Sequence, residues 1–124
     1  MSELLFKEEC YEIIGHCFEV HNNLGKGFAE IVYKDALEIE LDKAGINYSR
    51  EKQYNVNYKG IILSHCFKLD FLIFENIVVE IKGVSNIREE FIAQAINYLK
   101  ISQNRLALIV NFGEEKLTYK RIIV

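Results

Sequence analysis

The feature that most constrains this chain is the stretch KLDFLIFENIVVEIKG, residues 68–83. Two apolar, strand-like segments flank a short turn at 74–76, and three charged residues interrupt them: Asp70, Glu80 and Lys82. A charge within an apolar strand destabilises a protein unless the charge is paired, exposed or bound to a metal ion. The stretch therefore predicts a β-hairpin that carries either a polar surface ladder or a functional site.

The length of the turn predicts how the two strands pair. A three-residue turn at 74–76 places Ile73 opposite Ile77 and, further along, Asp70 opposite Glu80. Because side chains alternate across a strand, one face should receive all four charges: Lys68, Asp70, Glu80 and Lys82. The other face should be the core face, and it receives the apolar side chains: Leu69, Phe71, Val79 and Ile81.

Two carboxylates opposite each other on a sheet repel unless a cation lies between them. A hard divalent ion such as Mg²⁺ suits carboxylate oxygens and keeps several of its waters. Lys82 follows Glu80 on the same face, where an ammonium could stabilise a developing negative charge or orient an attacking water. The alternative is a surface salt-bridge ladder made of the same charges, and the hairpin alone leaves both interpretations open.

The rest of the chain predicts a mixed α/β fold. Apolar residues three and four positions apart predict three helices, over residues 5–22, 28–43 and 88–102. Alternating or continuous apolar runs predict four strands, over residues 47–58, 61–73, 77–82 and 105–112. The ending KLTYKRIIV is expected to be an edge strand. The helix between the third and fourth strands is a crossover, so those two strands should be parallel.

Composition limits the classes of protein that fit. The 124 residues suit one domain over 1–124, and the net charge of −3 excludes nucleic-acid binding through bulk charge, so a local basic patch would be needed. Cys10, Cys17 and Cys66 have no CxxC spacing, which argues against a zinc site and favours reduced thiols and a cytoplasmic location. The N-terminal MSELLFKEEC is too acidic for a signal peptide, and no run is apolar enough for a membrane helix.

The charged hairpin resembles the D…ExK signature of the PD-(D/E)XK nuclease superfamily, here Asp70, a spacer, and Glu80-Ile81-Lys82. The superfamily core has the order α-β-β-β-α-β, with the signature on its second and third strands, which is where it falls in this chain. Leu69 stands at the position of the proline in the superfamily's name. That position is variable within the superfamily.

Further motifs extend the resemblance over nearly the whole chain. Residues 94–98 (QAINY) resemble the QxxxY motif of the RecB-like branch, and residues 27–33 (GFAEIVY) match the motif that names the GxxExxY protein family. The ending is also similar to that family, with NFG at 111–113 and KRI at 120–122. Lys68 stands where the GxxExxY pattern more often has arginine, which keeps the charge but not a bidentate grip on phosphate. The resemblance implies a single nuclease-like domain with a mixed central sheet, an extra N-terminal helix and a C-terminal edge strand.

The resemblance implies a role for each matched residue. Asp70 and Glu80 would ligate Mg²⁺ or Mn²⁺, with the Ile81 backbone carbonyl as a further ligand. Glu30 would complete the carboxylate cluster directly or through water. Lys82 would be the catalytic lysine.

The QxxxY motif, on the predicted helix over residues 88–102, supplies two more candidate site residues. Gln94 would steady Lys82 or the metal-bound water, and Tyr98 would contact the substrate backbone. Each implied role has a simpler alternative. Glu30 could be an exposed carboxylate near a helix N-terminus, Gln94 a solvated helix residue, and Tyr98 part of the core. Tyr33 is interpreted as a packing residue.

We therefore expect a Mg²⁺- or Mn²⁺-dependent nuclease that hydrolyses phosphodiester bonds in nucleic acid, with DNA expected in preference to RNA. The alternative is a nuclease-fold module that binds nucleic acid or protein with little or no turnover. A third interpretation, a purely structural α/β domain, would explain the fold but not the paired carboxylates.

Basic residues near the end of the chain are candidates for substrate binding. Lys68, Lys120 and Arg121 are the candidates for substrate contact. With Lys116, Lys120 and Arg121 form the densest basic cluster, and together with Lys68, Arg88 and Lys100 this cluster could form the local patch that the overall charge does not supply. They could equally be solubilising charges on an edge strand. The apolar character of that strand predicts a homodimer that covers the edge, although a different partner could cover it too.

Overall fold

The structure is a computed structural model that describes residues 5–124. Its helices are α1 (Lys7–Leu24), α2 (Glu30–Lys43) and α3 (Glu89–Ser102). Its strands are β1 (Tyr48–Tyr58), β2 (Ile61–Ile73), β3 (Ile77–Lys82), β4 (Leu106–Asn111) and β5 (Thr118–Ile123). The expected order of helices and strands is confirmed. The expectation about a signal peptide falls partly on residues 1–4, which lie outside the described residues.

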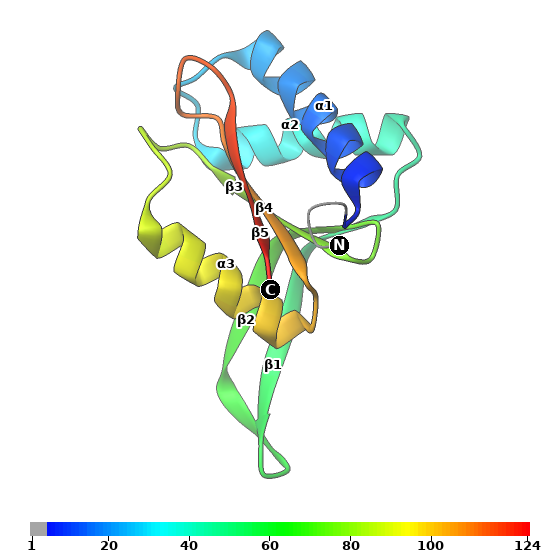
Figure 1. Ribbon diagram of the computed structural model, residues 1–124, viewed down its shortest axis with the longest axis vertical. Helices are drawn as coiled ribbons and strands as arrows, with labels where there is room; N and C mark the ends of the chain where they lie inside the picture. The colour runs from blue at the N-terminus through cyan, green and yellow to red at the C-terminus, as the bar shows by residue number, and fades with distance from the viewer. Residues whose placement is uncertain (1–4) are drawn as a thin grey trace.

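The strands form one mixed sheet in the order β1-β2-β3-β4-β5 (Figure 1). As expected for strands joined by a helical crossover, β3 and β4 are parallel, and the other neighbouring pairs are antiparallel. β5 lies at one edge of the sheet, also as expected. Cys10, Cys17 and Cys66 are free thiols. Between residues 5 and 124, no helix is long and apolar enough to cross a membrane.

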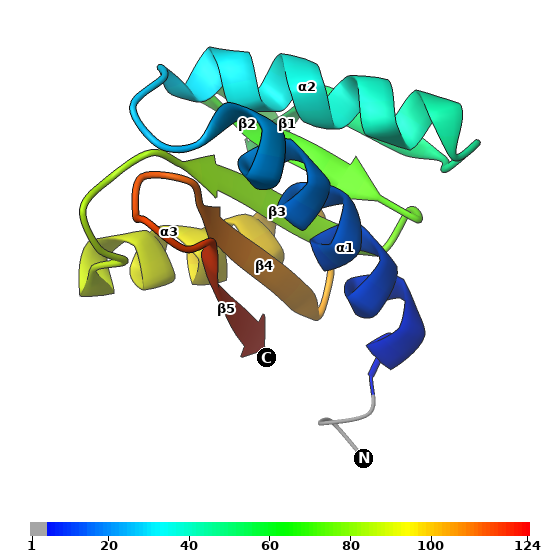
Figure 2. The ribbon, with the colours of Figure 1, turned by 90° about the horizontal axis from the view of Figure 1, so that it is seen from above.

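Helices cover the sheet on both faces. Figure 2 shows α1 and α2 on one face and α3 on the other. Each face therefore has its own hydrophobic core, and β4 is buried along its whole length. A strand covered on both faces is expected to be apolar at successive positions rather than alternating. This accounts for the continuous apolar run in the fourth strand.

The predicted hairpin register is confirmed, but the predicted sorting of side chains onto faces is wrong at Leu69. Ile73 pairs with Ile77, and the ladder ends at the pair of Phe71 and Val79. Lys68 and Lys82, which were expected to lie opposite each other, are therefore outside the paired part of the two strands. Leu69 packs in the core beneath α3, whereas Phe71 packs in the core beneath α1 and α2.

The reason is an interruption at Asp70. The ladder between β1 and β2 passes from Arg50–Phe71 to Lys52–Leu69 without a Glu51–Asp70 pair. Glu51 there has φ 56°, in the left-handed region. The alternation of side chains reverses across this point. The hairpin sequence has no glycine or proline at the interruption, so nothing in its apolar pattern indicated it.

Candidate functional site

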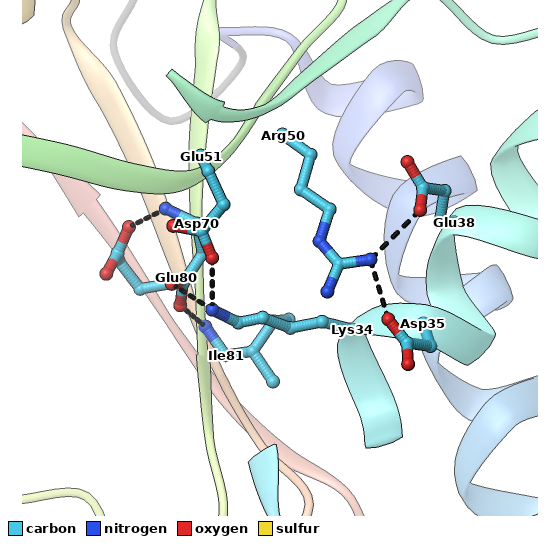
Figure 3. Close-up of polar contacts among 8 residues, drawn as sticks. All are labelled: Lys34, Asp35, Glu38, Arg50, Glu51, Asp70, Glu80 and Ile81. Atoms are coloured by element: carbon cyan, nitrogen blue, oxygen red, sulfur yellow. Dashed lines mark hydrogen bonds and ion pairs between the residues drawn. The ribbon is translucent and has the colours of Figure 1, made fainter. Parts of the chain in front are cut away.

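Asp70 and Glu80 lie where β2 and β3 stop pairing through their backbones, and their side chains bridge the gap. The Ile81 N–H donates to Asp70 Oδ2 at 2.8 Å, and the Asp70 N–H donates to Glu80 Oε2 at 3.0 Å (Figure 3). Each carboxylate thus accepts a hydrogen bond from the opposite strand. The structure brings the two predicted carboxylates together between the strands, rather than side by side on an open surface.

Glu80 is in an unfavourable environment for a charged carboxylate. It is only 4% exposed. Burial, and then the neighbouring negative charge of Asp70, raise the pKa of Glu80 to about 8, although the Asp70 N–H and the ammonium groups of Lys82 and Lys34 act in the opposite direction. A surface salt-bridge ladder needs exposed carboxylates, so this burial disfavours that alternative. A cation close to the pair would favour the ionised form.

A lysine that the sequence did not single out already lies against Asp70. The Lys34 Nζ, on α2, is 2.9 Å from Asp70 Oδ1 and 2.7 Å from Glu51 Oε1 (Figure 3). Burial alone would lower the pKa of this ammonium, but its hydrogen bonds and charge attraction to Glu51 and Asp70 outweigh burial and raise it. One signal could have found Lys34: it follows Glu30 by four residues, so the two share a helix face.

The predicted catalytic lysine and its predicted glutamine are brought together. The Lys82 Nζ donates to Gln94 Oε1 at 3.2 Å and lies 4.7 Å from the centre of the Phe91 ring. Both partners are on α3, so this helix holds the ammonium at the end of β3. Gln94 is itself exposed, which leaves its amide accessible to solvent.

Glu30 contacts the backbone that follows Lys82, and not the other two carboxylates. It is the first residue of α2, and its Oε2 accepts the Gly83 N–H at 2.9 Å. A Cβ at Gly83 would lie 3.4 Å from the Glu30 Cγ, which is an ordinary van der Waals contact, so Glu30 packs closely against this position. Glu30 therefore positions the end of β3 in the structure, and its expected place in the carboxylate cluster stays a prediction.

Asn111, from the NFG segment, also holds the chain that follows Lys82, through hydrogen bonds to Val84. It is fully buried, and its Oδ1 accepts the Val84 N–H at 3.0 Å while its amide donates to the Val84 carbonyl at 2.9 Å. A Cβ on Gly113 would lie 2.3 Å from the Val84 carbonyl oxygen, so only glycine fits there. The NFG segment thus fixes the chain just after the ExK tripeptide.

The two tyrosines of the motifs have different surroundings. Tyr98 is half-buried against the core beneath α3. Burial, and then the negative charges of Glu80, Asp70 and Glu51, raise the pKa of its hydroxyl, which places that hydroxyl in the field of the carboxylates. Tyr33 is fully buried, donates to the Gly25 carbonyl at 2.7 Å and stacks on Phe112. Its interpretation as a packing residue is confirmed.

The three basic candidates for substrate binding lie apart. Lys68 is on β2 next to the site, opposite Gln53 of β1. Lys120 and Arg121 are on β5, at the edge of the sheet away from β2. Because they are consecutive in a strand, they point to opposite faces, and the Arg121 guanidinium donates to the Leu5 carbonyl. These three residues do not make a single patch.

The donor groups present suit a hard divalent ion. In a strand, a residue's N–H and C=O point to the same side, so the Ile81 carbonyl faces Asp70 as its N–H does. Two carboxylates and a carbonyl, completed by waters, match the coordination that Mg²⁺ prefers. Within the part of the chain that the structure describes, no three His, Cys, Asp or Glu side chains converge as a closed metal cage. The ammonium of Lys34 shows that a cation is accommodated at Asp70.

Comparison with known families agrees with this geometry. The model of the PD-(D/E)XK nuclease superfamily matches residues 7–122, and the chain belongs to this superfamily. The resemblance inferred from the D…ExK signature is therefore confirmed at the level of the superfamily. Its assignment to the GxxExxY branch stays a prediction.

A solved structure titled "Crystal structure of SSO0001" is similar, with a TM-score of 0.59 and 19% sequence identity. The match covers 74% of this chain and 48% of that one, so the chain spans about half the length of that protein. At this identity the likeness shows the fold alone. The comparison with curated proteins gave no match.

Proposed function

We propose that the protein is a Mg²⁺- or Mn²⁺-dependent nuclease that hydrolyses phosphodiester bonds in nucleic acid. The observation that carries the proposal is the pair of carboxylates formed by the partly buried Asp70 and the buried Glu80, each held by a backbone N–H of the opposite strand. Such a pair is unfavourable without a cation, and few structural roles would account for it. With the Ile81 carbonyl beside it, the pair would hold a divalent ion through oxygen donors.

The side chains around the pair suit phosphoryl chemistry. When bound, the divalent ion would lower the pKa of a water molecule and polarise the scissile phosphate. Lys82, kept in place by Gln94 and the Phe91 ring, would stabilise the negative charge that develops on the phosphate oxygens. The Tyr98 hydroxyl would donate to the substrate backbone, and Glu30 would hold the loop after Lys82.

The hairpin of β1 and β2 supports nucleic acid as the substrate. It extends beyond the rest of the sheet (Figure 1). Residues 52–68 contain three lysines and no Asp or Glu, although the whole chain carries a net charge of −3. Two of these lysines lie over tyrosine rings: Lys52 over Tyr54, and Lys59 over Tyr58. A stretch that carries lysines and no acid between them favours a phosphate backbone as its partner.

The test measures metal binding and cleavage in the same variants. Wild-type protein should bind Mn²⁺ by calorimetry and cleave single- or double-stranded DNA or RNA with Mg²⁺ or Mn²⁺. Asp70→Asn should abolish both, because it removes a charged ligand without changing the size of the side chain. Glu8→Gln, at an exposed carboxylate of α1, is the matched control and should behave as wild type.

Two results would count against the proposal in different ways. If Asp70→Asn binds Mn²⁺ as wild type does, the assignment of the metal site is wrong. If the wild type binds Mn²⁺ and nucleic acid but cleaves none of the four substrates, the binding module replaces the nuclease.

A further inference from the structure

Both oxygens of Asp70 are engaged. Oδ2 accepts the Ile81 N–H at 2.8 Å, and Oδ1 lies 2.9 Å from the Lys34 ammonium. The bond to Ile81 belongs to the junction of β2 and β3, so it is kept as long as the strands keep their register. Oδ1 is thus the oxygen that a metal ion would take, and Lys34 already lies against it.

Lys34 has a second anionic partner. Its Nζ is 2.7 Å from Glu51 Oε1, and the Lys34 side chain is only 13% exposed. Glu51 is more open, at 42% exposed, against 17% for Asp70. The ammonium can therefore give up Asp70 without being left buried and unpaired, because Glu51 keeps it neutralised.

The position of Glu51 is specific. It has φ 56°, which is unfavourable for a residue with a side chain, and it lies at the step where β1 and β2 leave their ladder opposite Asp70. Glu51 has this backbone conformation at the step opposite Asp70, and from there the Glu51 carboxylate contacts Lys34. Strained backbone conformations of this kind cluster at functional sites.

Lys34 is not needed to attach α2 to the sheet. Arg50 of β1 makes that connection, with ion pairs to Asp35 at 2.8 Å and to Glu38 at 2.9 Å (Figure 3). The Tyr48 hydroxyl adds a bond to Glu38 at 3.0 Å. These contacts also occupy Asp35 and Glu38, two carboxylates of α2 that follow Lys34 in the sequence.

We propose that Lys34 is a built-in, displaceable counterion of the metal site, and that Glu51 is its second holding point. In the metal-free protein Lys34 neutralises Asp70. If Asp70 held a divalent cation, Lys34 would release Asp70 and stay with Glu51 alone. The inference rests on the proposed metal site. Lys34 and Glu51 are thus positioning residues with opposite effects on the affinity for the metal. The Lys34 ammonium lowers this affinity because it competes with the ion for Asp70. Glu51 raises the affinity because it binds the same ammonium.

The test is a double-mutant cycle read by Mn²⁺ calorimetry. Lys34→Met should bind Mn²⁺ about tenfold more tightly than wild type, because the competing cation is gone. Glu51→Gln should bind it about tenfold more weakly, because Lys34 is then held by Asp70 alone. In the Lys34→Met background, Glu51→Gln should have no effect, since Glu51 acts only through Lys34. Lys43→Met, an exposed lysine at the end of the same helix, controls for the loss of one positive charge.

The metal-free protein supplies an independent readout. Without metal, Lys34→Met should melt at a lower temperature than wild type, because Asp70 and Glu51 lose their shared cation, and Mn²⁺ should raise its melting temperature more than it raises that of wild type. Circular dichroism checks that each variant is folded. Lys34→Gln, which keeps a hydrogen-bond donor, replaces Lys34→Met if the latter is unfolded.

The outcomes separate this inference from the proposed function. If wild type binds Mn²⁺ and Lys34→Met binds it no more tightly, the counterion role is wrong and the metal site stands. If Glu51→Gln weakens binding equally in both backgrounds, Glu51 acts on the metal directly and the inference is overturned. If Mn²⁺ binds to Lys34→Met but not to wild type, the counterion role is supported in its strongest form. If neither protein binds Mn²⁺, both proposals fail.

Discussion

Lys82 extends from the end of β3 to α3, where Gln94 and the Phe91 ring hold its ammonium. A lysine has four flexible methylenes, so an unsupported ammonium would sample many positions. Two contacts on a neighbouring helix reduce that freedom before any substrate arrives. Preorganised charge of this kind is the main way in which a side chain stabilises a transition state.

Lys82→Ala should therefore lower nuclease activity by about two or more orders of magnitude while Mn²⁺ affinity stays close to that of wild type. Gln94→Ala should have a smaller effect on the same rate, about tenfold, because Phe91 still confines the ammonium. Cleavage rates at saturating metal and calorimetric affinities measure the two quantities separately. Lys43→Ala serves as the control, and a Lys82→Ala protein with wild-type activity would remove this residue from the mechanism.

Among the elements, the hairpin of β1 and β2 has two parts with different tasks. Its inner part contributes Asp70 and Glu51 to the site, and its outer part carries lysines on a ribbon that extends past the sheet (Figure 1). Beyond the interruption at Asp70 the side chains change faces, as Tyr54 packs beneath α3 and Tyr48 beneath α2. The same break that forms the site thus also orients the ribbon.

If the ribbon contacts phosphates, Lys52→Ala combined with Lys59→Ala should flatten the salt dependence of duplex binding. The slope of log affinity against log salt should fall by up to about two units, at about 0.9 per phosphate contact. The measurement is fluorescence anisotropy with a labelled duplex in Ca²⁺ or a chelator, so that no cleavage occurs. The double variant should bind Mn²⁺ as wild type does.

Replacing Lys116 and Lys120, at or beside β5, is the matched control with the same change in charge. Because β5 lies at the edge of the sheet away from the hairpin, this pair should leave the slope nearly unchanged. If the β5 pair flattens the slope and the hairpin pair does not, nucleic acid binds at the opposite edge from the one we infer.

For the whole molecule, the buried Glu80 links stability to pH. The pKa of Glu80 is about 8 in the folded, metal-free protein, against an ordinary value of 4.5. Between these values the folded state binds a proton that the unfolded state has released, so stability falls as pH rises from 4.5 to about 8. The stabilising contribution is complete below this window and lost above it.

Urea unfolding of metal-free wild type should accordingly show lower stability at pH 8 than at pH 5.5, with a slope from this group of at most about 1.4 kcal/mol per pH unit. Glu80→Gln should lack this component, because an amide does not titrate. Parallel pH profiles for the two proteins would show that Glu80 is not the group responsible. Adding Mn²⁺ at pH 8 should restore stability in wild type only.

Much of the fold could be predicted because its signals are local. Turn length set the pairing of Ile73 with Ile77, and the apolar period set the bounds of the helices and strands to within a few residues. The opposition of Asp70 and Glu80 in the D…ExK signature followed from the same register, because the two residues lie equally far from the turn at 74–76. The parallel pair β3–β4 followed from the helix between those strands.

The contacts that define the candidate site depended on the tertiary structure. Lys34, Glu51 and Asp70 come from a helix and two strands, and no local period indicates that they meet. Leu69 was assigned to the wrong face because a left-handed residue in the neighbouring strand, Glu51, interrupts the alternation.

The burial of Glu80 likewise depends on which faces the helices cover. By itself, then, the sequence determined the order of the elements, the hairpin register and the motif residues, because period and turn length act over a few neighbouring residues. Only the tertiary structure decided which charges share a site, because charge pairing depends on distances between segments that lie far apart along the chain.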